Sequence, residues 1–224
     1  TAFSVGDDHG RRVVRSRGDD DPALEAVLAD PEAAMAAGSL VKAGNTATVV
    51  RVGDFMIKRY NVKDVRHLLR QRLRSSRARR AWRAGHGLRF AGVATPRPRA
   101  LIEEPRLRVG RAIAYLVLDY AHGTPLAEAV RCGGFDADLA NRVHMLFRGL
   151  RTARLSHGDT KASNFLVVGD EVTVLDLDAA VFHRGRRRFE QRHRRDVERF
   201  LRNWDDVAPA ASEQRQRLFD GRPA

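Results

Sequence analysis

Three polar side chains lie close together in the segment SHGDTKASNFLVV, which runs from Ser156 to Val168. Asp159, Lys161 and Asn164 follow the spacing D-x-K-x-x-N. Phosphoryl transfer from ATP needs a carboxylate that accepts or orients a hydroxyl proton, a cation near the phosphate, and oxygen ligands for magnesium. One loop with this spacing supplies all three parts. The pattern therefore predicts that Asp159 and Lys161 are catalytic and that Asn164 binds metal.

A second acidic residue follows in VLDLD, where Asp176 comes directly after an apolar run. FLVV and VTVLDL are typical of short strands, and the Gly169-Asp170 pair between them predicts a hairpin turn. The hairpin would return Asp176 to the same end as Asn164, so the two oxygen ligands could share one magnesium ion. Asp178 could bind a second metal or cap the loop, and both interpretations stay open.

The elements that must position these residues begin with a strand-rich half. Three antiparallel strands are predicted at 39–43, 47–52 and 55–60, because β-branched residues alternate with turn signals at Gly44-Asn45 and Gly53-Asp54. The continuous apolar run at 112–120 predicts a buried strand. A helix is predicted at 63–90, with buried positions at Leu68, Leu69, Leu73, Trp82 and Leu88.

The second half is richer in helices. Apolar residues at a spacing of three and four predict a helix over 136–154, and a basic helix follows over 188–204. At the N-terminus we expect a loose segment at 1–21 and one helix at 22–38. The chain is thus predicted to be α+β, with an N-terminal extension (1–38), an antiparallel-sheet lobe (39–119) and a short, mostly helical lobe (120–224).

The 224 residues carry a formal net charge of +13, which favours anionic partners. No Asp or Glu occurs from Val65 to Ile102, and the arginines of this span are Arg66, Arg70, Arg72, Arg74, Arg77, Arg79, Arg80, Arg83, Arg89, Arg97 and Arg99. This arginine field is either a solvated helix face or a docking site for an anionic surface. Cys132 is the only cysteine, which is typical of a reducing compartment, and no apolar run has the length of a membrane span.

The segment HGDTKASN resembles the catalytic loop H-R-D-x-x-x-x-N of the protein-kinase-like superfamily, and VLDLD resembles its metal-binding D-F-G segment. The resemblance implies further site residues in the first half of the chain. FMIKRY is similar to the strand whose lysine contacts the ATP phosphates, here Lys58. VKAGNTATVV lies at the place of the glycine-rich loop and implies that Gly44, Asn45 and Thr46 cover the phosphates. LVLDYAHG is similar to the hinge that holds adenine through backbone groups, at Asp119 and Ala121.

Within this superfamily, the chain most resembles the bacterial kinases of the lipopolysaccharide inner core, which phosphorylate heptose or Kdo. The resemblance rests on HGDTKASNFLV with VLDLD, on SRARRAWRAGHGL followed by GVATPRP, and on HRRDVERFLRNW. It implies a compact bilobal kinase fold, ATP and Mg²⁺ as cofactors, and an anionic glycolipid as substrate. It also implies a cytoplasmic protein that can lie peripherally on the inner membrane. Nucleic acid is not an expected partner, and the oligomeric state is left open.

Three departures from the protein kinases bear on function. From Val65 onward the predicted helix at 63–90 has no carboxylate to pair with Lys58. The alternatives are Asp64 at its start, Glu103, Glu25 and Glu32, unless ATP alone pairs with the lysine. Gly158 replaces the arginine that reads a phosphorylated activation loop, so we expect no such regulation. The short second lobe favours a sugar acceptor over a protein. A kinase acting on another acceptor and a pseudokinase scaffold remain alternatives.

Overall fold

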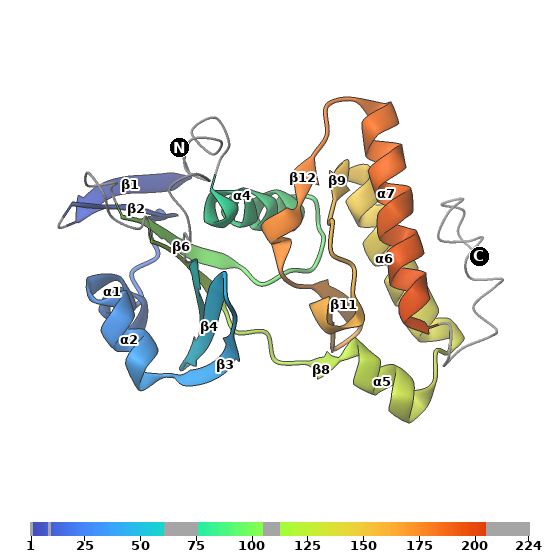
Figure 1. The fold of residues 1–224 in the computed structure, drawn as a ribbon, viewed down its shortest axis with the longest axis horizontal. Helices are drawn as coiled ribbons and strands as arrows, with labels where there is room; N and C mark the ends of the chain where they lie inside the picture. The colour runs from blue at the N-terminus through green and yellow to red at the C-terminus, as the bar shows by residue number, and fades with distance from the viewer. Residues whose placement is uncertain (1, 9, 61–75, 105–112, 205–224) are drawn as a thin grey trace. The chain divides into compact units, whose positions relative to one another are not determined.

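The computed structural model describes residues 2–8, 10–60, 76–104 and 113–204. Figure 1 shows them as a ribbon coloured from the N-terminus (blue) to the C-terminus (red). They form two compact units. Unit 1 comprises Thr1–Trp82 with Arg97–Tyr120, and unit 2 comprises Arg83–Pro96 with Ala121–Ala224. Two boundaries differ from the sequence prediction. Residues 83–96, predicted in the first lobe, belong to unit 2, and the predicted extension 1–38 is part of unit 1.

Unit 1 is built on an antiparallel sheet of seven strands in the order β1-β2-β6-β7-β5-β4-β3. The strands are β1 (Phe3–Asp8), β2 (Arg11–Ser16), β3 (Ser39–Ala43), β4 (Ala47–Val52), β5 (Phe55–Tyr60), β6 (Pro98–Glu103) and β7 (Ala114–Asp119). The predictions for β3, β4 and β5 are confirmed, and β7 lies within the predicted run.

Two parts of this sheet were not predicted. The N-terminal segment, expected to be loose, forms the β1–β2 hairpin, whose turn is closed by the Gly10 N–H donating to Asp7 Oδ1 at 3.0 Å. Strand β6, for which no strand was predicted, begins at Pro98. Proline is tolerated as the first residue of a strand, because only its missing N–H is lost from the ladder.

The predicted helix at 22–38 is two helices, α1 (Pro22–Ala29) and α2 (Pro31–Ala37). Pro31 cannot continue a helix because it lacks an N–H and clashes with the preceding turn. Asp30 ends α1 and caps α2 by accepting from the Ala33 N–H at 3.0 Å. The buried side chains of α1 and α2 pack against one face of the sheet, including Phe55, Ile57 and Val117. This cluster is the core of unit 1.

Helix α4 (Arg77–Phe90) contributes to both units, since its residues up to Trp82 belong to unit 1 and the rest to unit 2. Trp82 and Leu88 are buried as predicted. Residues 61–75 of the predicted helix, with Leu68, Leu69 and Leu73, lie outside the described residues.

Unit 2 contains helices α5 (Leu126–Gly133), α6 (Ala137–Thr152) and α7 (Arg186–Leu201). The predicted hairpin is confirmed as β10 (Phe165–Val168) and β11 (Glu171–Val174), and β8 (Thr124–Pro125) pairs with β10. A two-stranded sheet pairs β9 (Leu155–Ser156) with β12 (Val181–Phe182). The core of unit 2 includes a cluster of aromatic rings: Phe147, Phe165, Phe200 and Trp204.

The segment before β6 packs with unit 2 through strand β11. The Val174 N–H donates to the Ala94 carbonyl at 3.0 Å, and Thr95 Oγ1 donates to the Val174 carbonyl at 2.8 Å. Among the described helices, none has the length and hydropathy that a membrane span requires.

Candidate active site

The loop that carries Asp159 begins at the end of β9 with a fully buried histidine. His157 Nε2 lies 2.8 Å from the Leu175 carbonyl, and the Asp159 N–H donates to His157 Nδ1 at 3.2 Å. Because a carbonyl only accepts, Nε2 carries the proton and Nδ1 is the acceptor. Both imidazole nitrogens therefore form hydrogen bonds. One links the loop to Leu175, the residue before Asp176, and the other holds the Asp159 backbone. These bonds indicate a structural role for His157.

Helix α7 holds the same loop from the other side. Asp196 accepts from the N–H groups of His157 at 2.6 Å and of Gly158 at 2.9 Å. Its carbonyl accepts from Thr160 Oγ1 at 2.5 Å, and Asn203 Nδ2 donates to the Thr160 carbonyl at 3.0 Å. The backbone on both sides of Asp159 is therefore anchored to one helix.

Asp196 is not among the predicted site residues, although it lies in the segment HRRDVERFLRNW. The signal is helical spacing: Asp196 lies among the buried positions Phe189, His193, Val197 and Phe200, so a carboxylate occupies the apolar face. Burial raises the pKa of Asp196 above its ordinary value, and the two backbone N–H groups partly offset that rise. A buried carboxylate that accepts two backbone bonds indicates a structural anchor.

Gly158 adopts a conformation that an L-residue rarely takes, with φ of +80°. A Cβ atom added here would lie 3.0 Å from Ala179 Cβ and 3.1 Å from the Ala179 carbonyl oxygen. The arginine that protein kinases carry at this position would therefore be strained. The departure seen in the sequence has a local structural reason.

The carboxylate of Asp159 contacts the other two residues of the predicted D-x-K-x-x-N site. Lys161 Nζ lies 3.4 Å from Asp159 Oδ2, and Asn164 Nδ2 lies 3.3 Å from the same oxygen. Asn164 Nδ2 also donates to the Asp159 carbonyl at 2.8 Å. A fourth side chain, which the sequence did not predict, is Arg199, whose Nη2 lies 2.7 Å from Asp159 Oδ1. The D-x-K-x-x-N spacing thus brings its three side chains together, and α7 adds a cation.

The β10–β11 hairpin brings the second acidic residue back toward Asn164, as its turn signal predicted. The Leu175 N–H donates to the Asn164 carbonyl at 2.8 Å, so Asp176 follows directly after a residue bonded to Asn164. Asp176 itself is left-handed, with φ of +53°, a conformation that is costly for a non-glycine residue. Asp178 is buried, and the structure does not decide between its two predicted roles.

The donor set around Asn164 suits magnesium better than a transition metal. Because Asn164 Nδ2 turns to Asp159, its side-chain oxygen remains for a cation, and Asp176 offers a carboxylate. Within the described part of the chain, no three His, Cys, Asp or Glu side chains group to hold a metal. Magnesium fits two oxygen ligands, since it is commonly held by one or two protein groups together with substrate phosphates and water.

Lys58 lies in the middle of β5, opposite Val49 of β4 and Leu116 of β7. Its Nζ is 5.3 Å from the centre of the Tyr60 ring. The next residue, Arg59, contacts Glu32 of α2 at 2.7 Å. Successive strand residues face opposite sides of a sheet, so Lys58 points to the face away from α1 and α2.

The carboxylates predicted as alternatives for Lys58 have other partners where the structure describes them. Glu25 and Glu32 belong to α1 and α2, on the opposite face. Glu103 shares the face of Lys58, but it accepts from Ser76 Oγ at 3.0 Å and pairs with Arg79 of α4. Asp64 lies outside the described residues. The helix α4 therefore contributes a cation to this face, where a protein kinase would contribute a carboxylate.

The predicted phosphate-covering loop is the β3–β4 turn. The Gly44 N–H donates to the Ala47 carbonyl at 3.0 Å, and Asn45 and Thr46 lie within this turn. A Cβ atom at Gly44 would lie only 2.9 Å from the Ala47 oxygen, so the turn requires glycine there.

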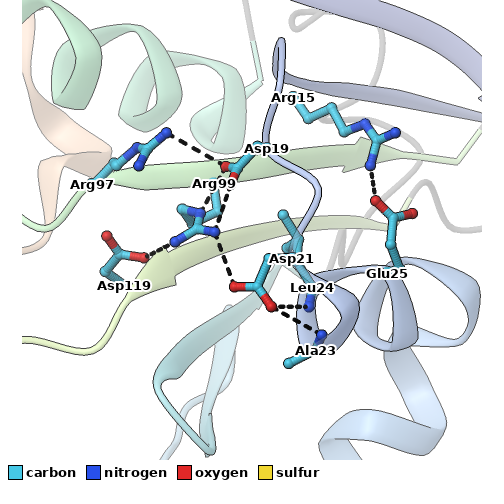
Figure 2. Close-up of polar contacts among 9 residues, drawn as sticks. All are labelled: Arg15, Asp19, Asp21, Ala23, Leu24, Glu25, Arg97, Arg99 and Asp119. Atoms are coloured by element: carbon cyan, nitrogen blue, oxygen red, sulfur yellow. Dashed lines mark hydrogen bonds and ion pairs between the residues drawn. The ribbon is translucent and has the colours of Figure 1, made fainter.

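Asp119 ends strand β7 and is held by an ion-pair network with Arg99 at its centre (Figure 2). Arg99 Nη1 lies 3.0 Å from Asp119 Oδ1, and Arg99 Nη2 lies 2.6 Å from Asp19 Oδ1 and 3.1 Å from Asp21 Oδ2. The Asp119 N–H donates to the Arg97 carbonyl at 2.9 Å. The N-terminal segment thus fixes the side chain of a predicted adenine-binding residue. Ala121 begins the second segment of unit 2.

Part of the arginine field is neutralised within unit 1. Arg79 pairs with Glu103, and Arg99 and Arg97 pair with Asp19 at 2.6 Å and 3.6 Å. Arg66, Arg70, Arg72 and Arg74 lie outside the described residues. Arg79, Arg97 and Arg99 therefore have carboxylate partners within unit 1. The arginine field offers less unpaired charge to an anionic surface than the sequence indicates.

Comparisons with known proteins agree with this arrangement at the level of the fold. No protein-family model matches the sequence. A segment of 112 residues, half of this chain, is 32% identical to the "Probable bifunctional tRNA threonylcarbamoyladenosine biosynthesis protein" of Methanothermobacter thermautotrophicus, and it spans only 19% of that protein. Among solved structures, "WaaP in complex with acyl carrier protein" matches with a TM-score of 0.66 over 95% of this chain and 90% of WaaP, at 18% identity. The likeness to WaaP confirms the predicted bilobal, protein-kinase-like fold.

Proposed function

We propose that this chain is an ATP-dependent kinase that transfers the γ-phosphoryl group to a sugar hydroxyl of the lipopolysaccharide inner core. The observation that carries the proposal is the Asp159 carboxylate, with Lys161 Nζ at 3.4 Å and Asn164 Nδ2 at 3.3 Å on a loop anchored by α7. The resemblance of the sequence motifs to those of the lipopolysaccharide core kinases and the fold likeness to WaaP support the choice of the lipopolysaccharide core.

In this proposal Asp159 accepts the hydrogen bond of the acceptor hydroxyl and orients it. The hydroxyl oxygen forms a bond to the γ-phosphorus while the bond to the β,γ-bridging oxygen breaks, and ADP leaves. The hydroxyl proton passes to Asp159 and from there to water. Lys161 places its positive charge where negative charge develops on the moving phosphoryl group.

Asn164 and Asp176 would hold magnesium, and their oxygen atoms are the ligand type that this ion prefers. Bound magnesium neutralises charge on the β- and γ-phosphates of ATP. Lys58 would contact the ATP phosphates, and Gly44, Asn45 and Thr46 would cover them. The backbone groups of Asp119 and Ala121 would receive the adenine.

The net charge of +13 supports an anionic partner, and we propose a glycolipid substrate reached from the cytoplasmic face of the inner membrane. Acyl carrier protein, which accompanies WaaP in the matched structure, is a further partner to test by co-purification.

The test is transfer of labelled phosphate from Mg·ATP to a panel of acceptors: lipopolysaccharide core lacking phosphate, a generic protein, and aminoglycosides. Wild type is compared with Asp159→Asn and with Asp170→Asn, a control in which an almost fully exposed turn carboxylate is changed. Transfer to the core that is lost only in Asp159→Asn supports the proposal. Absence of both transfer and ATP binding would leave a pseudokinase scaffold.

The match to a tRNA threonylcarbamoyladenosine biosynthesis protein favours a second candidate, a kinase of the same fold that acts on a protein or another small molecule. Transfer to the generic protein but not to the core would select it. The threonylcarbamoyladenosine content of tRNA in a strain that lacks the gene is a second readout, because a lipopolysaccharide kinase would leave it unchanged.

A further inference from the structure

Arg199 of α7 makes a contact that the proposed mechanism does not use. Its Nη2 lies 2.7 Å from Asp159 Oδ1, while Asp159 Oδ2 faces Lys161 Nζ at 3.4 Å and Asn164 Nδ2 at 3.3 Å. Each oxygen of the candidate catalytic carboxylate therefore has its own donor. The shortest of these contacts is the ion pair with Arg199.

The helix around Arg199 has a fixed position relative to the loop. Asp196, three residues earlier, accepts from the His157 and Gly158 N–H groups, and Asn203, four residues later, donates to the Thr160 carbonyl at 3.0 Å. Residues at this spacing share one face of a helix. Asp196 and Arg199 of α7, with Asn203 in the short 3-10 helix that follows it (Arg202–Trp204), thus hold the backbone before Asp159, its carboxylate, and the backbone after it.

The neighbours of the other oxygen have different duties in the proposed reaction. Lys161 would follow the phosphoryl group and Asn164 would turn its oxygen to magnesium, so both are shared with the substrate. The proposed reaction gives Arg199 no role toward the phosphoryl group or magnesium. We propose that Arg199 is a positioning residue that keeps the Asp159 carboxylate in the orientation that receives the acceptor hydroxyl, an inference that rests on the proposed function.

If Arg199 had a purely structural role, its loss would lower the stability of the fold. The side chain of Arg199 is 47% exposed and that of Asp159 is 27% exposed. Ion pairs with this exposure contribute little to folding, because water screens them and the side chains lose entropy. Loss of Arg199 should therefore lower the reaction rate while it leaves the melting temperature nearly unchanged.

The test is a double-mutant cycle of Arg199→Ala and Asp159→Asn, read as phosphate transfer and as Mg·ATP hydrolysis without acceptor. The control is Arg195→Ala, which removes an exposed arginine from the same helix. We expect Arg199→Ala to lower kcat on the order of 10- to 100-fold, with the KM for ATP within about twofold, since a small misplacement of a reacting group has effects of this size. Arg199→Lys should recover part of the rate, and Arg195→Ala should resemble wild type.

In the Asp159→Asn background, Arg199→Ala should change the residual rate by less than about twofold, because Arg199 acts through Asp159. An equal loss in both backgrounds, or an unchanged rate in Arg199→Ala, overturns the positioning role while the kinase proposal stands. A wild-type protein with neither transfer nor hydrolysis overturns the proposed function, and the positioning role with it.

Discussion

Replacement of Asp196 by alanine tests the anchor beneath the candidate active site. The carboxylate accepts from the N–H groups of His157 and Gly158, and both Asp196 and His157 are buried. In Asp196→Ala the His157 N–H is left in the interior without its acceptor, and water can replace only part of the bond at the exposed Gly158. The loop that carries Asp159 loses its fixed backbone.

The size of the effect follows from these two bonds. A buried donor without an acceptor costs about 1–3 kcal/mol, and the more exposed bond adds about 0.5–1 kcal/mol. Removal of a buried carboxylate, whose pKa is raised by burial, offsets a fraction of this loss. We therefore expect Asp196→Ala to lower the free energy of unfolding by about 2–3 kcal/mol. For a chain of this size the melting temperature should fall by roughly 6 °C.

The assay is urea unfolding followed by circular dichroism, together with hydrogen exchange of the His157 and Gly158 amides. Glu198→Ala is the matched control, because it removes an exposed carboxylate two residues further along α7. The control should lie within about 0.5 kcal/mol of wild type. Equal stability of Asp196→Ala and wild type, with unchanged protection of the two amides, would refute the assignment of Asp196 as an anchor.

Three further predictions concern other buried or strained groups. Burial and Arg151 lower the pKa of His193 to about 4, so stability is full above pH ~6.5 and falls by about 3 kcal/mol as the pH drops toward 4; His193→Phe should flatten this dependence in urea titrations at several pH values. Arg99→Met should destabilise the chain by about 3 kcal/mol because the buried Asp19 carboxylate loses its close partner and keeps only the longer contact with Arg97 at 3.6 Å, and it should raise the KM for ATP; Arg99→Met with Asp19→Asn should recover stability, and no recovery would contradict the charge argument. Asp176→Gly should be about 1 kcal/mol more stable than Asp176→Ala in thermal melts, because only alanine keeps the left-handed strain at φ of +53°, and both should lack magnesium-dependent transfer.

The features that the sequence predicted well are local ones. Strands β3, β4 and β5 follow one another through two tight turns, and the hairpin between Asn164 and Asp176 has its own turn signal at Gly169-Asp170. The spacing of Asp159, Lys161 and Asn164 lies within a single loop. Such contacts form between residues near in sequence, so composition and spacing carry the information.

Local signals also misled where a neighbour in space decides the outcome. The polar N-terminal segment has weak strand character, yet β2 becomes a strand because it pairs with β6, far along the chain. Strand β6 was not predicted, and it begins at Pro98, since a strand can begin at proline when its ladder bonds come from the following residues. Pro31 split a predicted helix because its missing N–H and the Asp30 cap act together.

The sequence by itself indicated the type of chemistry that we propose, because a carboxylate, a lysine and an amide at one spacing suit phosphoryl transfer wherever the loop lies. Only the tertiary structure decided which groups hold that loop. Asp196 and Arg199 reach it from a helix 38 to 40 residues further along, and Arg99 reaches Asp19 across 80 residues. Such pairs leave no spacing pattern, since the packing of the buried face of α7 and the register of the sheet bring them together.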